Sequence, residues 1–165
     1  MIDKATREKI ISLIRREVVP ALGCTEPIAV SLAVAKATEL LGMQPEEINL
    51  GLSGNIIKNA MGVGIPGTGM IGLPIAIALG SLIGKSEYGL EVLKEVSPEA
   101  VDRGKAFIES VPINIKHLPD SPSNLHVDVE VRAQGHSARA VISREHTFFV
   151  FLEKDGRTIF AEEEG

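Results

Sequence analysis

The sequence contains no tryptophan, and aromatic residues make up only 4% of its 165 residues, although 44% are hydrophobic. A core of this composition must be aliphatic and rich in alanine, which suits closely packed helices. The length corresponds to about one domain. We therefore predict a single domain over residues 1–165.

Cysteine is also nearly absent, because Cys24 is the only one in the chain. One thiol forms no internal disulfide, and it cannot hold an iron–sulfur cluster alone, since a cluster takes about three or four thiolates. The sequence contains neither a C-x-x-C nor an H-E-x-x-H pattern. We therefore expect no metal site formed by this chain alone.

Long basic runs and long apolar runs are missing too. The net charge is −5 with no basic run, so nucleic acid is not an expected partner. The longest apolar run, residues 70–84, contains Gly and Pro and is shorter than the ~20 residues that cross a bilayer. The first ten residues, MIDKATREKI, alternate charged with apolar residues, unlike a signal peptide. We expect a soluble, cytoplasmic protein with no membrane partner.

Apolar periodicity predicts several helices. Residues 25–41 are apolar nearly all round and indicate a central helix, with Thr25 or Glu26 as its cap and Gly42 after its end. Ser97 and Pro98 are typical of the cap and first position of a helix over 98–110. Further helices are expected over residues 3–18, 70–83 and 87–96.

Alternating apolar residues predict strands, most of them in the last third of the chain. Residues 47–54 form one short strand, and residues 125–133 alternate strictly between valines and polar residues. Asp155-Gly156 and Gly135 are typical of hairpin turns. Further strands are expected over residues 138–143, 146–153 and 154–161. The fold class is therefore α+β, with helices packed on an antiparallel β-meander from the C-terminal third.

Cys24 lies in the stretch PALGCTEPIAV, directly before the expected central helix. Free backbone N–H groups and the positive end of the helix dipole favour a thiolate there, so its pKa should fall. The alternative is a buried cysteine that fills space in the core.

A glycine-rich stretch, residues 53–72, contains a G-x-G-x-x-G pattern at Gly67, Gly69 and Gly72. No strand is predicted before these glycines, so the pattern does not indicate a dinucleotide site. A loop whose backbone amides bind an anion such as a carboxylate fits better, and a plain connection between helices is the alternative. Side-chain donors for such an anion are Asn55, Lys58 and Asn59, although Lys58 can equally be a solvated lysine.

Histidines give a weaker signal. His126 and His136 fall on the polar side of a strand and in a turn, so we expect both at the surface. His146 and Thr147 begin an apolar strand, where side chains often face a site.

Four segments carry a family resemblance: PALGCTEPIAVSLAVAKA, SGNIIKNAMGVGIPGTGMIGLPIAIALG, GLEVLKEV and the His-Thr pair at 146. The L-G-C-T-E-P and P-G-T-G-M motifs follow one another about 40 residues apart. Together these segments resemble the N-terminal half of the L-cysteine desulfidase family, which is related to the alpha chain of iron–sulfur-dependent L-serine dehydratase. The resemblance covers residues 10–155.

The resemblance implies a lyase that eliminates the β-substituent of L-cysteine or L-serine, giving pyruvate, ammonia and sulfide or water. Members resemble dehydratases in which one iron of a [4Fe–4S] cluster acts as a Lewis acid on the leaving group. By position, Cys24 matches the motif cysteine, as a base or as a thiolate near the cluster, and His146 fits a histidine at the edge of the site. Thr25 and Glu26 match the neighbours of that cysteine, and Asn55, Lys58 and Asn59 fit a polar set that faces the substrate. From these positions we infer that Glu26 and Lys58 are catalytic, and that the substrate-binding residues are Thr25, Asn55, Asn59, Gly67, Thr68 and Gly69.

The chain departs from this family in length and in cysteine content. Family chains are more than twice as long, and their cluster cysteines lie in the later half. We therefore expect a partner, either a cysteine-rich C-terminal half or a second subunit, and no activity from this chain alone. We also expect self-association, because the apolar helices over 26–41 and 70–83 carry more surface than a small sheet can cover.

Two other functions stay open at this point. Lys58 could form a Schiff base with pyridoxal phosphate, with the glycine-rich loop on the phosphate. The chain could also be a non-enzymatic amino-acid-binding or regulatory module, which would bind a small amino acid without turnover.

Overall fold

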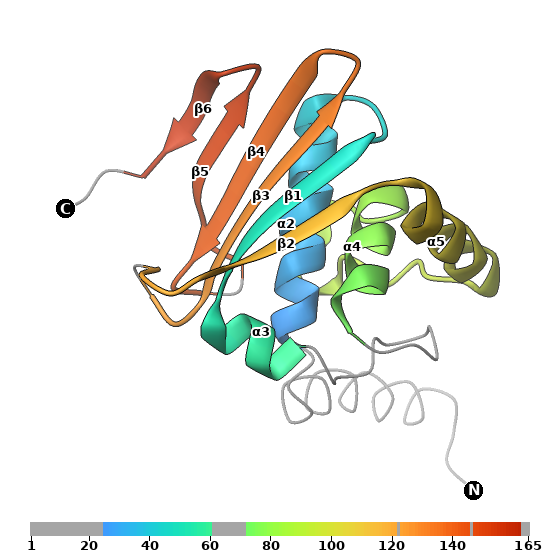
Figure 1. Cartoon of the computed structure of the whole chain (residues 1–165), viewed down its shortest axis with the longest axis horizontal. Helices are drawn as coiled ribbons and strands as arrows, with labels where there is room; N and C mark the ends of the chain where they lie inside the picture. The colour runs from blue at the N-terminus through green and yellow to red at the C-terminus, as the bar shows by residue number, and fades with distance from the viewer. Residues whose placement is uncertain (1–24, 61–71, 122, 146, 163–165) are drawn as a thin grey trace, which may run out of the picture.

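The computed structural model describes residues 25–60, 72–121, 123–145 and 147–162, and these form two layers (Figure 1). One layer is a six-stranded sheet with the order β2-β1-β3-β4-β5-β6. Helices lie against one face of that sheet. The helical elements are α2 (Thr25–Leu41), α3 (Gly54–Ala60), α4 (Leu73–Leu82), the 3-10 helix η1 (Ser86–Glu91) and α5 (Pro98–Ser110). The strands are β1 (Glu47–Ser53), β2 (Ile113–Leu118), β3 (His126–Ala133), β4 (His136–Ser143), β5 (Phe149–Lys154) and β6 (Arg157–Ala161).

Helices α2 and α4 pack closely because small residues line their contact. Ser31 Oγ on α2 donates a hydrogen bond to the Ala76 carbonyl oxygen on α4 at 2.7 Å. A Cβ placed on Gly80 would lie 2.6 Å from the Ser31 carbonyl oxygen, so only glycine fits there. Helix α2 ends at Gly42, whose φ of +79° places it in the left-handed region that glycine adopts freely. The alanine-rich composition is therefore used where two helices approach most closely.

Helix α5 begins as its sequence predicts. Ser97 Oγ accepts a hydrogen bond from the Ala100 backbone N–H at 3.1 Å, and Pro98 occupies the first helical position. Phe107 is buried on the inner face of this helix, which packs against α4. The Ser97 cap supplies an acceptor to one of the backbone donors that the start of a helix leaves unpaired.

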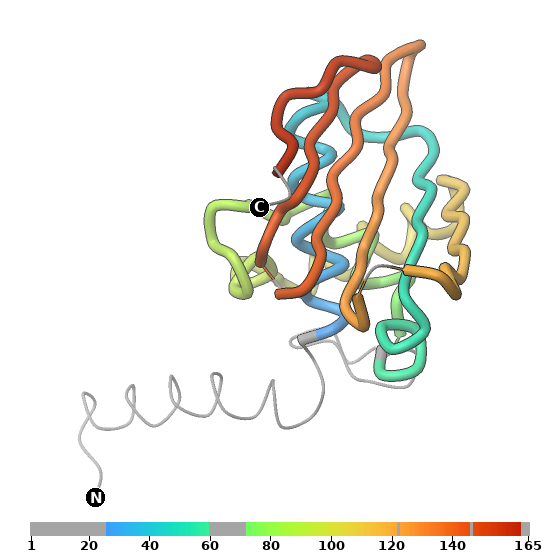
Figure 2. The backbone as a smooth tube through the Cα atoms, turned by 90° about the vertical axis from the view of Figure 1, so that its left-hand side faces the viewer, coloured from blue at the N-terminus to red at the C-terminus, as the bar shows by residue number. Residues whose placement is uncertain are grey.

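The sheet is antiparallel except at one edge. Strands β3 to β6 form a meander, and Figure 2 shows them running side by side. Its two tight turns have positive φ at Gln134 and Gly135 and at Asp155 and Gly156, as two-residue hairpin loops require. Strand β1 lies between β2 and β3, parallel to β2 and antiparallel to β3. The valines of β3 are buried against α2, as the alternation predicted.

The α+β class and the meander are confirmed, whereas one strand was missed and two local expectations are wrong. Strand β2 and its parallel pairing were not predicted. Residues 54–60 form helix α3 instead of a loop. The helix expected over 87–96 is a 3-10 helix followed by turns, because Gly89 adopts a φ of +56° that no α-helix tolerates. The helix expected over 3–18 lies outside the described residues.

We expected α2 and α4 to leave apolar surface exposed, but the structure buries it. Their large apolar residues are buried within this chain, including Leu32, Ile75 and Leu79. The reason given for self-association is therefore wrong for these two helices. Large apolar side chains that are exposed lie elsewhere among the described residues, at Leu90, Ile115, Phe148, Ile159 and Phe160. Within the described residues, no helix has the length and apolar character needed to cross a membrane.

Candidate functional site

One end of the sheet gathers the segments that carry the sequence motifs. Helix α3 directly follows β1 and contacts α2, β1 and β2. His126 at the start of β3 pairs with Ser143 at the end of β4, beside the end of β1. Figure 1 shows the first turn of α2, helix α3 and the start of α4 at this same end. We call this region the motif end of the sheet.

Several predicted site residues lie outside the described residues, namely Cys24, Gly67, Thr68, Gly69 and His146. Their described neighbours in sequence are at the motif end. Thr25 is the first residue of α2, and Gly72 precedes the first residue of α4. After β4, the Ser143 N–H donates to the Phe148 carbonyl oxygen at 3.2 Å, which turns the chain back towards β5.

Glu26 lies in the first turn of α2. Glu26 is half-buried, and its Oε2 atom is inaccessible to solvent. A carboxylate at this position is favoured by the positive end of the helix dipole. The sequence correctly placed Glu26 at the start of the central helix.

The polar set Asn55, Lys58 and Asn59 lies on α3. Ile56 is fully buried and anchors this short helix on the core. The spacing of three and four residues puts Asn55, Lys58 and Asn59 on one face. Asn59 Nδ2 donates to Asn55 Oδ1 at 3.2 Å, and Lys58 is exposed. The three donors are therefore brought together by a helix rather than by the loop that the sequence predicted.

His117 on β2 faces the start of α3. A Cβ built on Gly54 would lie 2.9 Å from His117 Nε2, so glycine there lets the imidazole approach the helix backbone. The sequence did not single out His117. Its signal was not recognised because β2 itself was not predicted.

A hydrogen-bonded cluster of hydroxyls and one imidazole lies at the motif end as well. His126 Nδ1 is 3.1 Å from Ser143 Oγ, and Ser123 Oγ is 3.2 Å from the same oxygen. Ser53 Oγ donates to the Asn124 carbonyl oxygen at 2.8 Å and accepts from the His126 N–H at 3.2 Å. Burial lowers the pKa of His126, because the charged imidazolium is less solvated there. His126 is thus half-buried, not a plain surface residue as expected.

This cluster holds the chain in place and does not form a nucleophilic triad. The nearby carboxylate of Asp128 is bound by Arg139, with Oδ1 2.8 Å from Nε and Oδ2 2.5 Å from Nη2. Ser143 is buried, so its hydroxyl is not presented to a substrate. Two of the hydroxyls instead donate to backbone carbonyl oxygens of the loop before β3, Ser53 to that of Asn124 and Ser123 to that of Leu125.

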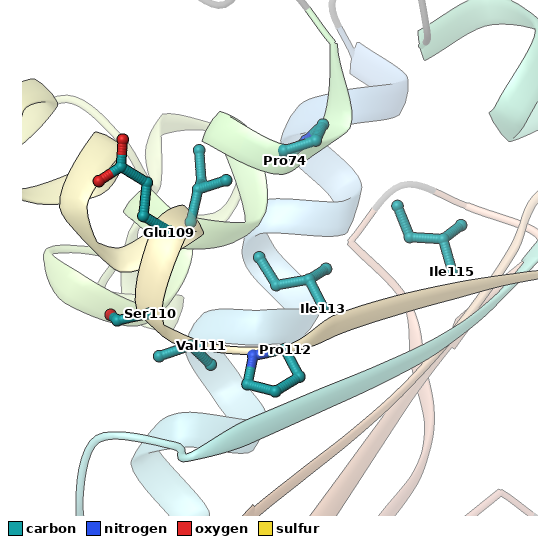
Figure 3. A pocket seen from close by; sticks show the side chains of 8 residues that line it. Pro74, Glu109, Ser110, Val111, Pro112, Ile113 and Ile115 are labelled. Carbon is teal, nitrogen blue, oxygen red and sulfur yellow. The ribbon is translucent and has the colours of Figure 1, made fainter.

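A separate groove of about 340 Å³ lies beside β2 (Figure 3). Ile113 and Ile115 point from β2 towards the side on which Pro74 lies, and the end of α5 forms the far wall. None of the predicted site residues lines it. Glu109 and Ser110 are the polar side chains among its lining residues, so the groove lacks the convergent donors that an amino acid would need.

The residues present do not fit an iron–sulfur cluster. The whole sequence has one cysteine, whereas a cluster takes about three or four thiolates. Within the described parts of the chain, no three His, Cys, Asp or Glu side chains are grouped so that they could hold a metal ion. A cluster of this kind would therefore have to be held by residues outside this chain.

Comparison with known proteins gives relatives that are much longer than this chain. This chain is 60% identical to a UPF0597 protein of Bacteroides fragilis over 151 residues, which are 92% of this chain and 35% of that protein. It is 58% identical to a UPF0597 protein of Phocaeicola vulgatus over 96% of this chain and 37% of the relative. For a UPF0597 protein of Aeromonas hydrophila the identity is 46%, over 97% of this chain and 36% of the relative.

No protein-family model matches the sequence. No solved structure matches it either. The chain spans little more than a third of the length of the curated relatives that it matches. It is thus similar along nearly its whole length to one part of the UPF0597 proteins.

Proposed function

We propose that this chain is part of an iron–sulfur-dependent lyase that removes the β-substituent of L-cysteine or L-serine. The products are pyruvate, ammonia and sulfide or water. One observation carries the proposal: the start of α2, helix α3, the start of α4 and the end of β4 meet at one end of the sheet. These elements belong to or adjoin three of the four segments of the family resemblance, the exception being GLEVLKEV at 89–96.

The residues of this chain would bind and orient the substrate. Asn55, Lys58 and Asn59 offer amide and ammonium donors from one face of α3, which suits a substrate carboxylate. Cys24 precedes α2, whose dipole favours a thiolate, and we assign it the removal of the Cα proton. Loss of the β-substituent then leaves an aminoacrylate, which hydrolyses to pyruvate and ammonia.

The proposal requires a further part of the protein. This chain cannot hold a [4Fe–4S] cluster, so a cysteine-bearing C-terminal half or second subunit must supply the ligands. The longer UPF0597 relatives have room for such a part. We place the assembled lyase in the cytoplasm, where thiols stay reduced.

Combining this chain with the part of the Bacteroides fragilis UPF0597 protein that it does not match tests the proposal. After anaerobic reconstitution with iron and sulfide, the pair should show a broad visible absorption band and release pyruvate from L-cysteine or L-serine. The isolated chain should do neither. Cys24→Ser should abolish turnover while the two parts still assemble.

Other outcomes would contradict the lyase proposal. Pyruvate or a cluster from the isolated chain would remove the need for a second part. An aldimine absorption band lost in Lys58→Ala would indicate pyridoxal phosphate. Amino-acid binding by the assembled pair without any turnover would indicate a binding or regulatory module.

Lys58 can be tested separately in the same assembled pair. Lys58→Ala should raise the KM for the amino acid about tenfold, because a hydrogen bond to a charged group is worth roughly 1.5–3 kcal/mol. Lys116→Ala, at an exposed lysine on β2, is the matched control and should leave KM unchanged. Equal KM values for the two variants would remove Lys58 from the substrate site.

A further inference from the structure

Strand β6 ends the sheet without cover. All five of its residues, Arg157–Ala161, are exposed. Ile159 is 54% exposed and Phe160 46%, the two highest values among the large apolar side chains of the described residues. Singly exposed apolar residues are common, but two in succession on an edge strand form a surface that favours pairing with another strand.

The helix layer stops short of this edge. Helix α2 packs on β3 and β4 and touches β5 only slightly, and in Figure 1 no helix lies against β6. Phe160 pairs with Leu152, which pairs with the buried Ala140 on the side of the sheet that faces α2. The apolar face of the sheet therefore continues past the helices and leaves Phe160 unburied at its margin.

Natural edge strands are usually blunted by charge or by proline. In β6 the only charged residue is Arg157, next to the hairpin turn, and the rest of the strand reads TIFA. A bulge between Leu152 and Glu153 interrupts the pairing with β5 on the inner side. The outer edge from Thr158 to Ala161 carries no charge that would repel another strand.

The relatives contain further polypeptide that is long enough to cover this edge. The UPF0597 relatives match nearly all of this chain, yet about two thirds of each relative lies outside the match. That remainder must pack against the matched part if the protein is one compact body. An extended segment added to a free sheet edge is a recurring mode of such packing.

We propose that a β-strand from the remainder of the UPF0597 polypeptide pairs with β6 as a seventh strand and covers Phe160. This strand should place apolar side chains on the face that continues Leu152 and Phe160. The inference shares with the proposed function the need for a further polypeptide part, but it requires no lyase chemistry.

Hydrogen exchange tests the inference on proteins as they exist. Amides 158–161 should exchange at least tenfold more slowly in the complete Bacteroides fragilis protein, at the aligned positions, than in this 165-residue chain. Amides of β2 should change less, because Pro112 and Pro119 flank that strand and Lys116 lies within it. Equal exchange at β6 in both proteins would overturn the inference.

A pair of substitutions supplies a second readout. Phe160→Lys in this chain should leave its melting temperature nearly unchanged, since the side chain is exposed, whereas the same change at the aligned position should lower that of the complete protein by several degrees. Ile115→Lys on β2 is the matched control and should have a small effect in both. A drop at position 115 alone would assign the contact to the other edge.

Self-pairing is the competing outcome. If amides 158–161 of this chain become protected as its concentration rises, and Phe160→Lys turns a dimer into a monomer, then a second copy covers β6 and the inference is wrong. Slow exchange at β6 in a complete protein that releases no pyruvate would leave the inference standing and remove the lyase proposal.

Discussion

The two edges of the sheet are built differently. Strand β2 has Pro112 before it and Pro119 after it, and it carries Lys116 and His117 in its exposed middle. Strand β6 has no proline, and its exposed residues beyond Arg157 are uncharged. The sequence of β2 therefore protects that edge against pairing with another strand, whereas the sequence of β6 lacks these protective residues.

The edges also differ in how they are attached. Strand β2 pairs in parallel with β1, Leu118 packs over Gly51, and Asn114 Nδ2 donates to Asn49 Oδ1 at 2.9 Å. Helices α4 and α5 lie on its side of the molecule (Figure 1). The β5–β6 hairpin is connected to the helix layer by Lys154, whose Nζ donates to the Leu41 carbonyl oxygen at 2.8 Å. A substitution that destabilises the helix layer should therefore destabilise β2 more than β6.

The largest effect is expected from Gly80→Ala. The new Cβ would lie 2.6 Å from the Ser31 carbonyl oxygen, a backbone atom that cannot rotate away, so α4 must move. We expect a loss of about 3 kcal/mol. The melting temperature should fall by roughly 6–12 °C. Hydrogen exchange should accelerate at β2 more than at β6, and the opposite order would break the comparison between the edges.

Gly104→Ala is the matched control for that substitution. Its Cβ would meet Ile75 Cδ1 at 2.8 Å, but this atom is the end of a flexible side chain. Alanine also favours the helix by about 1 kcal/mol over glycine. The variant should therefore lose much less stability than Gly80→Ala.

A smaller effect is expected from Lys154→Met. The substitution keeps the length of the side chain but removes the donor to the Leu41 carbonyl oxygen at the end of α2. A partly exposed bond of this kind should contribute about 1 kcal/mol. Native-state hydrogen exchange should show the loss in β5 and β6 and leave β2 unchanged. Lys116→Met on β2, as a control, should change neither edge.

Ser97→Ala should destabilise α5, on the β2 side of the molecule, by an amount similar to that expected for Lys154→Met. The hydroxyl accepts from the Ala100 N–H, and its loss leaves the start of α5 without that cap. Chemical denaturation should show a loss of about 1 kcal/mol. Ser110→Ala at the other end of α5 is the control, because that hydroxyl only donates to carbonyl oxygens within the helix. A loss as large at Ser110 would contradict the capping role.

The smallest effect is the dependence of stability on pH that comes from His126 on β3. The pKa of His126 is lowered in the folded chain, chiefly by burial, so the unfolded chain takes up its proton first as the pH falls. Stability should be unaffected by this group above about pH 7, should decline as the pH passes through the ordinary histidine value of about 6.5, and should level off below the lowered pKa. His126→Asn should flatten that decline in urea titrations between pH 7.5 and 5.

Most local structure could be predicted from the sequence, because short-range patterns determine it. The valine alternation of β3, the Asp155-Gly156 turn and the Ser97 cap all lie within a few residues of the structure they specify. Strand β2 escaped prediction because its burial does not alternate and it depends on pairing with a distant strand. Helix α3 escaped because its anchor, Ile56, stands in a glycine-rich stretch that resembles a loop.

The candidate site was predicted in parts but not as a whole. The sequence indicated Glu26 and the donors on α3, but their common location depends on the insertion of β1 between β2 and β3. The cluster of Ser53, Ser123, His126 and Ser143 was missed for the same reason, since its members come from three separate stretches of chain. Long-range pairing of this kind leaves little trace in local patterns.

The position of β1 has a consequence for synthesis of the protein. Ile48 pairs with Ile113, which follows 65 residues later, and Leu52 pairs with Val127. At roughly 5–20 residues per second, a ribosome needs about 3–13 s to make the first of these partners after β1 has been made. During that interval β1 is a nascent apolar strand with neither neighbour available, so this segment is where we expect a chaperone to act, while the later hairpins can close as soon as they leave the exit tunnel.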